Sequence, residues 1–360
     1  MNFAVEVPIN PVSFGQSAIC ILMELWKKQL QPSIFPIANI DTSAFTDLPQ
    51  DFALWLQSCI NKALKTYKRS DPCWRLWHCN GSHSSISDRT SLLTFLELDM
   101  ISDYEQNILK NQHKVLVSSK FTQSMLSDYD IQAEYCPLGF DSFSFKRLSK
   151  KYYDDDRIVF FLGGKAEKRK QTYKVLRAFA KRYGNQPGFM LHAAISNPFL
   201  KPEDQNALIS QALEGKNYFN IVFLPYQPTN LLMNDVYNSG HISINVSGAE
   251  GFDLVLLNML GLQKHAIVLN AHVYKDYTTD EMVTYVPPTG KERAIDNIFF
   301  HENAVFGVGN IFTTTEELII EGMEKAVEKY KKNPINVAAE KISQEFTWER
   351  SANIILESLK

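Results

Sequence analysis

The second half of the chain alternates between short apolar runs and amphipathic stretches, and this alternation restricts the possible folds more than any other feature. The apolar runs are IVFFLGG, FMLHAAI, NIVFLPY, ISINVS and AIVLNA, and the stretches between them are TYKVLRAFAKRYG, EDQNALISQALEG, LLMNDVYNSG and LVLLNMLGLQ. Short apolar runs favour buried strands, and apolar residues at helical spacing favour helices. The pattern therefore predicts a parallel sheet with helices on both faces.

The first half shows the same alternation less clearly. The run FAVEV precedes a loop and the helical stretch SAICILMELWKKQL, and later segments predict a helix at DFALWLQSCINKALKTY and strands at WRLWH and VLVSS. A chain of 360 residues is longer than one hydrophobic core usually serves. We therefore expect two α/β domains, joined by the charged segment 143–157, with a long helical region at the C-terminal end.

Composition and missing motifs exclude several classes of protein. Hydrophobic residues make up 45% of the chain, but no apolar run is long enough to span a membrane, and the first residues lack the basic start of a signal peptide. We therefore expect a cytoplasmic protein. A formal charge of -3 argues against non-specific coating of nucleic acid. There is no P-loop, HExxH, EF-hand or GxSxG motif, and the GxGxxG fingerprint of nicotinamide-dependent oxidoreductases is missing.

The sequence also predicts no bound metal. Its five cysteines show no metal-ligand spacing. The acidic run Asp154, Asp155 and Asp156 lies in the predicted linker beside Arg157 rather than after a strand. Such a run is typical of solvated surface charge.

A basic loop, GGKAEKRKQ, follows the run IVFFL and precedes a predicted helix. Gly163 and Gly164 allow the backbone to approach a ligand closely. The basic residues of the loop are Lys165, Lys168, Arg169 and Lys170. They place positive charge where a helix N-terminus already favours an anion, so the loop is a candidate site for a diphosphate. The same charges are also typical of a solvated turn.

An acidic loop, SGAEGFD, follows the run ISINV and precedes an apolar helix. Gly248 and Gly251 give conformational freedom on either side of Glu250. A carboxylate in such a loop can accept hydrogen bonds from sugar hydroxyls. Glu250 can equally cap the helix that follows, and the sequence leaves both interpretations open.

Two loops of the first half are further candidates. Gly15 lies in VSFGQS, at a predicted strand-to-helix turn, and His78 ends the run WRLWH. If both domains are doubly wound, the carboxyl ends of their strands face one cleft, and both residues face it too. Either residue can also be purely structural, because glycine is common in turns and a histidine at a strand end is more often structural than catalytic.

These features, in this order, resemble retaining glycosyltransferase family 4, a group 1 family with the GT-B fold. The similarity is carried by VFFLGGKAEKRKQTYKVLRAFA, VSGAEGFDLVLLNMLGLQKHAIVLN, FTWERSANIILESL and VLVSSKFTQSMLSDYDIQAEYCPLGFD. It implies two Rossmann-like, doubly wound domains that face a cleft, with the last helix crossing back to the first domain. The implied acceptor domain is 1–150 together with about 344–360, and the implied sugar-nucleotide domain is 151–343.

The resemblance also implies roles for particular residues. The implied catalytic residues are His78, Lys165, Lys170 and Glu250, with the two lysines on the donor diphosphate and Glu250 on the transferred sugar. The implied donor site is Gly15, Gly163, Gly164, Lys165, Lys170, Tyr226, Gly248, Glu250, Gly251, Phe252 and Asn258. Asn258 stands where the family has the second glutamate of its E-x7-E motif, which removes a charge-assisted bond to the donor ribose.

The function implied by the resemblance is transfer of a sugar, with retention, from a UDP- or GDP-sugar to an acceptor hydroxyl, without a cofactor or metal. The expected acceptor is a saccharide or glycan. A hydroxylated base in DNA is an alternative acceptor, with base and phosphate contacts from Trp74, Trp77, Lys62, Lys65, Lys68 and Arg69. A non-catalytic nucleotide-sugar binder is a second alternative, which Asn258 suggests.

Overall fold

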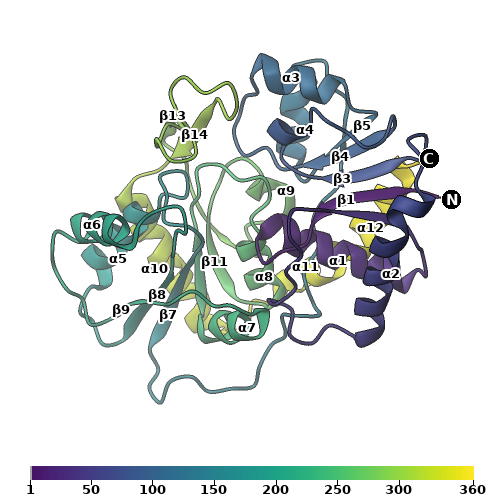
Figure 1. The fold of residues 1–360 in the computed structure, drawn as a ribbon. Coiled ribbons are helices and arrows are strands. Elements are labelled where there is room, and N and C mark those ends of the chain that lie inside the picture. Colours follow the sequence, from purple (N-terminus) through teal and green to yellow (C-terminus); the bar gives the residue numbers. More distant parts are fainter. Residues whose placement is uncertain (1) are drawn as a thin grey trace.

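The computed structural model describes residues 2–360 and contains two parallel six-stranded sheets, which lie side by side in Figure 1. The strands of the first sheet lie between Ala4 and Tyr135, and those of the second lie between Ile158 and Val286. Helices follow most of the strands and pack against both sheets. The predicted α/β architecture with two parallel sheets is confirmed.

The first sheet has the strand order β2-β1-β3-β4-β5-β6. Its strands are β1 (Ala4–Pro8), β2 (Ser33–Ile37), β3 (Cys73–Leu76), β4 (Thr90–Thr94), β5 (Lys114–Val117) and β6 (Ala133–Tyr135). Its helices are α1 (Ser13–Lys27), α2 (Gln50–Thr66), the 3-10 turn η1 (Cys79–Gly81), α3 (Asp103–Lys110) and α4 (Lys120–Ser127). The chain leaves β1 for β2 on one side and returns to β3 on the other. The strand order therefore reverses between β1 and β3, which is where open sheets bind ligands.

The second sheet has the order β12-β11-β10-β7-β8-β9. Its strands are β7 (Ile158–Gly163), β8 (Phe189–Ala194), β9 (Ile221–Phe223), β10 (Ile242–Asn245), β11 (His265–Leu269) and β12 (Thr284–Val286). Its helices are α5 (Thr172–Tyr183), α6 (Pro202–Ala212), α7 (Asn230–Ser239), α8 (Leu254–Gly261) and α9 (Tyr274–Tyr277). Here the order reverses between β7 and β10, so the loops after these two strands flank the expected ligand crevice.

A short antiparallel hairpin joins the two halves on one side of the molecule. It consists of β13 (Gly290–Arg293) and β14 (Asn310–Thr313). Lys291 Nζ lies 2.8 Å from Asp99 Oδ2 in the loop after β4, and the Asn310 amide donates to Asp99 Oδ1 at 2.8 Å. The hairpin therefore bridges from the second sheet to the loops of the first.

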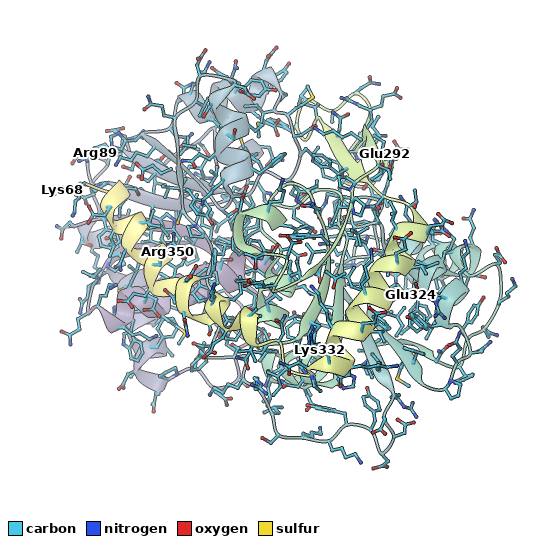
Figure 2. The ribbon with its side chains drawn as sticks, turned by 180° about the vertical axis from the view of Figure 1, so that it is seen from behind. Lys68, Arg89, Glu292, Glu324, Lys332 and Arg350 are labelled. Atoms are coloured by element: carbon cyan, nitrogen blue, oxygen red, sulfur yellow. The ribbon has the colours of Figure 1, made fainter. Side chains whose placement is uncertain are left out.

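The C-terminal end returns to the first half of the chain, as predicted. It consists of α10 (Glu316–Lys332), the 3-10 turn η2 (Val337–Ala339), α11 (Glu340–Glu345) and α12 (Trp348–Ser358). Figure 2 shows α10, marked by Glu324 and Lys332, and α12, marked by Arg350, on opposite sides of the molecule. Helix α12 packs against α1, and Ser351 Oγ donates to the Pro137 carbonyl at 2.6 Å.

Several strands were not expected from the sequence: β2, β4, β6, β12 and both hairpin strands. Strand β4 is fully buried, yet its sequence TSLLT contains three hydroxyl residues that interrupt an apolar run. The fold accommodates the middle one of these residues, because Ser91 Oγ donates to the Ser358 carbonyl of α12 at 2.9 Å. The partner that makes a polar residue acceptable in this strand therefore comes from the far end of the chain.

In the part of the chain that the structure describes, residues 2–360, no helix has both the length and the apolar character needed to cross a membrane.

Two histidines support the second sheet, of which His192 is buried and His241 is half-buried. His192 of β8 shares a 3.0 Å hydrogen bond between Nε2 and the Tyr153 hydroxyl, and His241 Nδ1 accepts from the Val159 amide at 3.0 Å. Burial lowers the pKa of each histidine to about 4. His241 must stay neutral, because its accepting nitrogen is already used by the backbone.

We expect these histidines to make the fold sensitive to mild acid. Their folded-state pKa lies below the unfolded value near 6.5, so the unfolded chain takes up protons first as the pH falls. The free energy of unfolding should therefore fall between about pH 6.5 and pH 4, and urea denaturation at a series of pH values measures it. His192→Gln should reduce this dependence, and the exposed His301→Gln should not. A curve that is flat across this range would rule the interpretation out.

Candidate active site

The basic and acidic loops meet at the reversal point of the second sheet. The basic loop follows β7, the acidic loop follows β10, and these two strands pair in parallel. Their carboxyl ends therefore lie at the same edge of the sheet. There Lys170 Nζ lies 2.5 Å from Glu250 Oε1. The two loops that the sequence singled out form one site.

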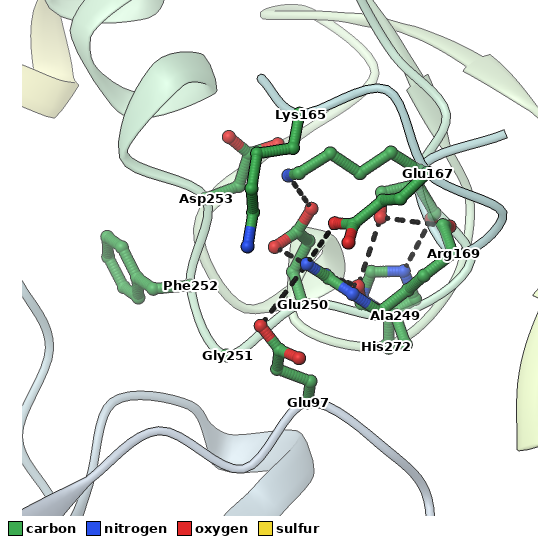
Figure 3. Close-up of polar contacts among 12 residues, drawn as sticks. Glu97, Lys165, Glu167, Arg169, Ala249, Glu250, Gly251, Phe252, Asp253 and His272 are labelled. Atoms are coloured by element: carbon green, nitrogen blue, oxygen red, sulfur yellow. Dashed lines mark hydrogen bonds and ion pairs between the residues drawn. The ribbon is translucent and has the colours of Figure 1, made fainter. Parts of the chain in front are cut away.

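Arg169 extends this contact into a buried ionic cluster, which Figure 3 shows. Its guanidinium nitrogens lie 2.9 Å from Glu250 Oε2, 2.7 Å from Glu167 Oε1 and 3.2 Å from Glu97 Oε1. Only 4% of the Arg169 side chain is exposed. Glu97 follows β4, so the cluster includes a carboxylate from the first half of the chain.

The cluster keeps Glu250 ionised in a buried position. Burial by itself would raise the pKa of Glu250, but Arg169 and Lys170 outweigh it and hold the pKa well below its usual range. The same pairing raises the pKa of Lys170 against the opposite effect of burial. Glu250 is therefore a carboxylate at neutral pH, and a carboxylate can accept hydrogen bonds from sugar hydroxyls.

Asp253 caps helix α8, which decides between the two interpretations of Glu250. Asp253 Oδ1 accepts from the Leu256 amide at 3.1 Å, and Oδ2 accepts from the Tyr274 hydroxyl at 2.8 Å. Asp253 has a φ of 73°, a left-handed conformation that is uncommon for residues other than glycine. The interpretation of Glu250 as the helix cap is wrong, because that position is filled by Asp253.

Two glycines allow close approaches within the site. Gly164 has a φ of 106°, and a Cβ atom there would lie 3.1 Å from the side-chain carbons of Lys170. A Cβ atom on Gly251 would lie 2.8 Å from Cβ of Phe95, in the first half of the chain. The Lys170 side chain therefore passes directly over the basic loop, and the acidic loop packs directly on the facing domain.

Lys165 differs from its neighbours because aromatic rings, rather than carboxylates, surround it. Its ammonium group lies 4.2 Å from the ring centre of Phe299 and 5.2 Å from that of Phe199. Among residues 2–360 it has no ion-pair or hydrogen-bond partner. Its charge therefore remains available to an anion, whereas Arg169 and Lys170 are each paired with a carboxylate.

His78 lies on the opposite wall, close to Lys165. Burial and then the charge of Lys165 lower the pKa of His78. Its ring packs against Phe14 with centres 4.3 Å apart, and Phe14 in turn packs against Phe95. The structure therefore brings together His78, Lys165, Lys170 and Glu250, although they come from both halves of the chain.

The other predicted donor residues occupy varied positions. Gly15 is buried in the first turn of α1, Tyr226 is 67% exposed in the loop after β9, and the Phe252 ring lies in the core. Gly163 ends β7, and Gly248 donates its amide to the Arg169 carbonyl at 2.8 Å. Asn258 is buried in α8, and its side-chain oxygen has no partner within residues 2–360.

Of the residues suggested for a DNA acceptor, three of the four basic ones are exposed, but neither tryptophan is. Trp74 is fully buried in β3, so the expectation that it stacks on a base is wrong. Trp77 is half-buried against Phe14. Arg69 pairs with Asp88, and Lys68 lies at the outer edge of the first half in Figure 2.

Sequence reasoning missed two members of the site. Arg169 was noted as one of several basic residues, but its central position depends on the pairing of β7 with β10. Glu97 carries no signal in its own segment, FLELD, because it reaches the site only when the two halves meet. Within residues 2–360, no group of three or more histidine, cysteine, aspartate or glutamate side chains could hold a metal ion. Independence from metal stays a prediction.

Two doubly wound domains that face each other across loops of this kind define the GT-B fold, and this chain has that fold. No family model matches the sequence, and no curated protein matches it.

Solved structures of glycosyltransferases match the whole chain. A glycosyltransferase from Rickettsia africae ESF-5 is 15% identical, with a TM-score of 0.69 over 100% of this chain and 97% of that one. Sucrose-phosphate synthase from Thermosynechococcus elongatus is 12% identical, with a TM-score of 0.66 over 99% and 98%. Anabaena HepE, in complex with UDP-glucose, is 12% identical, with a TM-score of 0.68 over 100% and 99%. The similarity lies in the fold, and the predicted GT-B architecture is confirmed.

We expect Glu250→Ala to destabilise the protein. Without the carboxylate, Lys170 and Arg169 lose a buried partner, and breaking such a pair typically costs about 3 kcal/mol of the free energy of unfolding. Urea denaturation measures the change. Glu321→Ala, which removes an exposed pair with Lys325, is the control and should have little effect. Equal stability of the two variants would show that the buried cluster does not hold the loops together.

Proposed function

We propose that this protein is a retaining glycosyltransferase that moves a sugar from a nucleoside diphosphate sugar to an acceptor hydroxyl. The observation that carries the proposal is the meeting of Lys165, Lys170 and Glu250 where the strand order of the second sheet reverses. The resemblance of the sequence and the shared fold with glycosyltransferases support it. HepE was solved with UDP-glucose, so a UDP-sugar is the first donor to test.

The proposed donor site separates the diphosphate from the sugar. Lys165 has a charge that no carboxylate neutralises, and helix α5 begins beside it, so this side of the site suits the diphosphate. Glu250 faces the same space as an ionised acceptor and suits the hydroxyls of the transferred sugar. The basic loop thus suits the negatively charged diphosphate of the donor, and the acidic loop suits its sugar.

The proposed reaction breaks the bond between the anomeric carbon and the diphosphate oxygen and forms a new bond to the acceptor oxygen. Negative charge develops on the leaving diphosphate, and fixed cations at Lys165 and Lys170 stabilise it most in the transition state. In the retaining mechanism, the acceptor attacks from the face that the diphosphate leaves. A diphosphate oxygen takes the acceptor proton, so no protein base is required.

The acceptor is proposed to be a saccharide or glycan that enters beside His78. This residue lies on the wall opposite Lys165, and the aromatic side chains of Phe14 and Phe95 support it. Phe14 is buried and Phe95 is partly buried, so the two rings support the imidazole from behind. The imidazole itself is exposed and offers a polar group to the acceptor. No contact of the described residues favours a DNA acceptor.

The two lysines should be essential for turnover. We expect Lys165→Ala and Lys170→Ala each to lower kcat by about a hundredfold, because each removes a cation from the developing charge. The measurement is release of nucleoside diphosphate from a panel of UDP-, GDP- and ADP-sugars. Lys181→Ala, an exposed lysine of α5 that pairs with Glu317, should leave kcat unchanged. Full activity of both site variants would reject the assignment.

The stereochemistry and the enzymatic role need separate measurements. Proton NMR of the first product formed should show the anomeric configuration of the donor, and an inverted product would exclude the retaining mechanism. Calorimetric binding of a sugar nucleotide without turnover or hydrolysis would instead support the non-catalytic binder. Asn258 stands at the second acidic position of the motif, and its buried side-chain oxygen has no partner within residues 2–360. The donor panel will show which base the site accepts.

A further inference from the structure

Arg169 touches three carboxylates that come from three different segments. Glu167 belongs to the same basic loop, Glu250 to the acidic loop after β10, and Glu97 to the loop after β4 in the first half. Its Nη1 group also donates to the Ala249 carbonyl at 2.5 Å. The Arg169 backbone adds a further contact, because its carbonyl accepts from the Gly248 amide. One residue therefore fixes the shape of the acidic loop around Glu250.

The guanidinium group is suited to this position for a geometric reason. Its nitrogen atoms donate in several fixed directions within one plane, so it can hold carboxylates on two edges at once. A lysine carries the same charge on one nitrogen atom, so it cannot place separate donors where Nη1 and Nη2 of Arg169 lie. The Arg169 side chain is almost fully buried, so the proposed donor does not touch it.

Glu97 has a different character from the two other carboxylates. It is 37% exposed, whereas the side chains of Glu167 and Glu250 are 1% and 7% exposed. Its distance to Arg169 is the longest of the three, at 3.2 Å. Nearby, Ser118 Oγ donates to the Gly251 carbonyl at 2.7 Å, also across the two halves. Both contacts require the two halves to be as close as they are in this structure.

We infer that Arg169 is a positioning residue, which makes the orientation of Glu250 depend on closure of the two domains. Glu97 belongs to the facing domain and contacts Arg169 only when the domains are closed. The inference rests on the proposed function, because it takes Glu250 to be the residue that binds the transferred sugar. In the open enzyme Arg169 holds Glu250 and Glu167 only. When Glu97 arrives, it becomes a second carboxylate on Nη2, beside Glu167. This third carboxylate restrains the guanidinium, whose Nη1 holds Glu250, and so fixes the Glu250 carboxylate for transfer.

A second ion pair between the halves provides a matched control. Lys291 Nζ lies 2.8 Å from Asp99 Oδ2, two residues after Glu97, but this pair touches neither Arg169 nor Glu250. If ion pairs merely hold the halves together, losing either pair has the same effect. If closure acts through Arg169, only the loss of Glu97 changes the chemistry.

The experiment compares Glu97→Gln with Lys291→Met in the full-length enzyme, using the donor that supports turnover of the unmodified protein. Glu97→Gln keeps the size of the side chain at a partly exposed site, and a urea midpoint confirms that it folds. We expect kcat to fall about tenfold while the dissociation constant of the donor changes less than about threefold, since misplacing a catalytic group slows the reaction step. Lys291→Met should keep kcat within about twofold of the unmodified enzyme.

A double-mutant cycle tests the route through Arg169. If Glu97 acts through Arg169, then Glu97→Gln should have little further effect on kcat in an Arg169→Lys background. Independent effects that multiply would overturn the inference, as would equal losses for Glu97→Gln and Lys291→Met or an unchanged kcat for Glu97→Gln. Failure of the proposed function looks different, because the unmodified protein would then neither bind nor turn over any donor of the panel.

Discussion

The Glu250 carboxylate, held between Lys170 and Arg169, is the interaction on which the rest of the site depends. A buried carboxylate or a buried cation alone is costly, and only their mutual pairing makes the loops around them stable. The pairing in turn requires β7 and β10 to be neighbours, because their loops must leave the sheet at the same edge. The order of strands and the charges of the loops therefore support each other. The result is a buried carboxylate that is held between two cations.

The connection between the two halves determines how the site can change. The chain crosses between them at two adjacent places, where the Phe140 amide donates to the Phe346 carbonyl at 2.8 Å. Helix α12 then packs on α1. Each half has its own sheet, so motion between them concentrates at these crossings and changes the loops that face each other. The contacts of Glu97 with Arg169 and of Gly251 with Ser118 lie among those loops. Both contacts therefore depend on how close the two halves are.

The sequence was sufficient for the second sheet because its strands are continuous apolar runs and its helices are strongly amphipathic. It was insufficient for β4, where the buried Ser91 hydroxyl finds its acceptor in α12, far along the chain. In the acidic loop, Glu250 and Asp253 are both able to cap a helix, and the hydrogen bond from the Leu256 amide to Asp253 assigns the cap to Asp253. The basic and acidic loops could be predicted as a site because each follows a strand. The role of Glu97 could not be predicted, because it depends on a contact with Arg169, which lies in the other half of the chain.

A crystal structure of the protein with UDP and a divalent-metal chelator would test the assignment of the site most directly. We expect the diphosphate to lie in hydrogen-bonding contact with the ammonium groups of Lys165 and Lys170, beside the N-terminal end of α5. Glu250 should remain ordered next to it, on the side where the sugar would extend. UDP bound elsewhere on the protein, or a diphosphate that contacts neither lysine, would contradict the assignment.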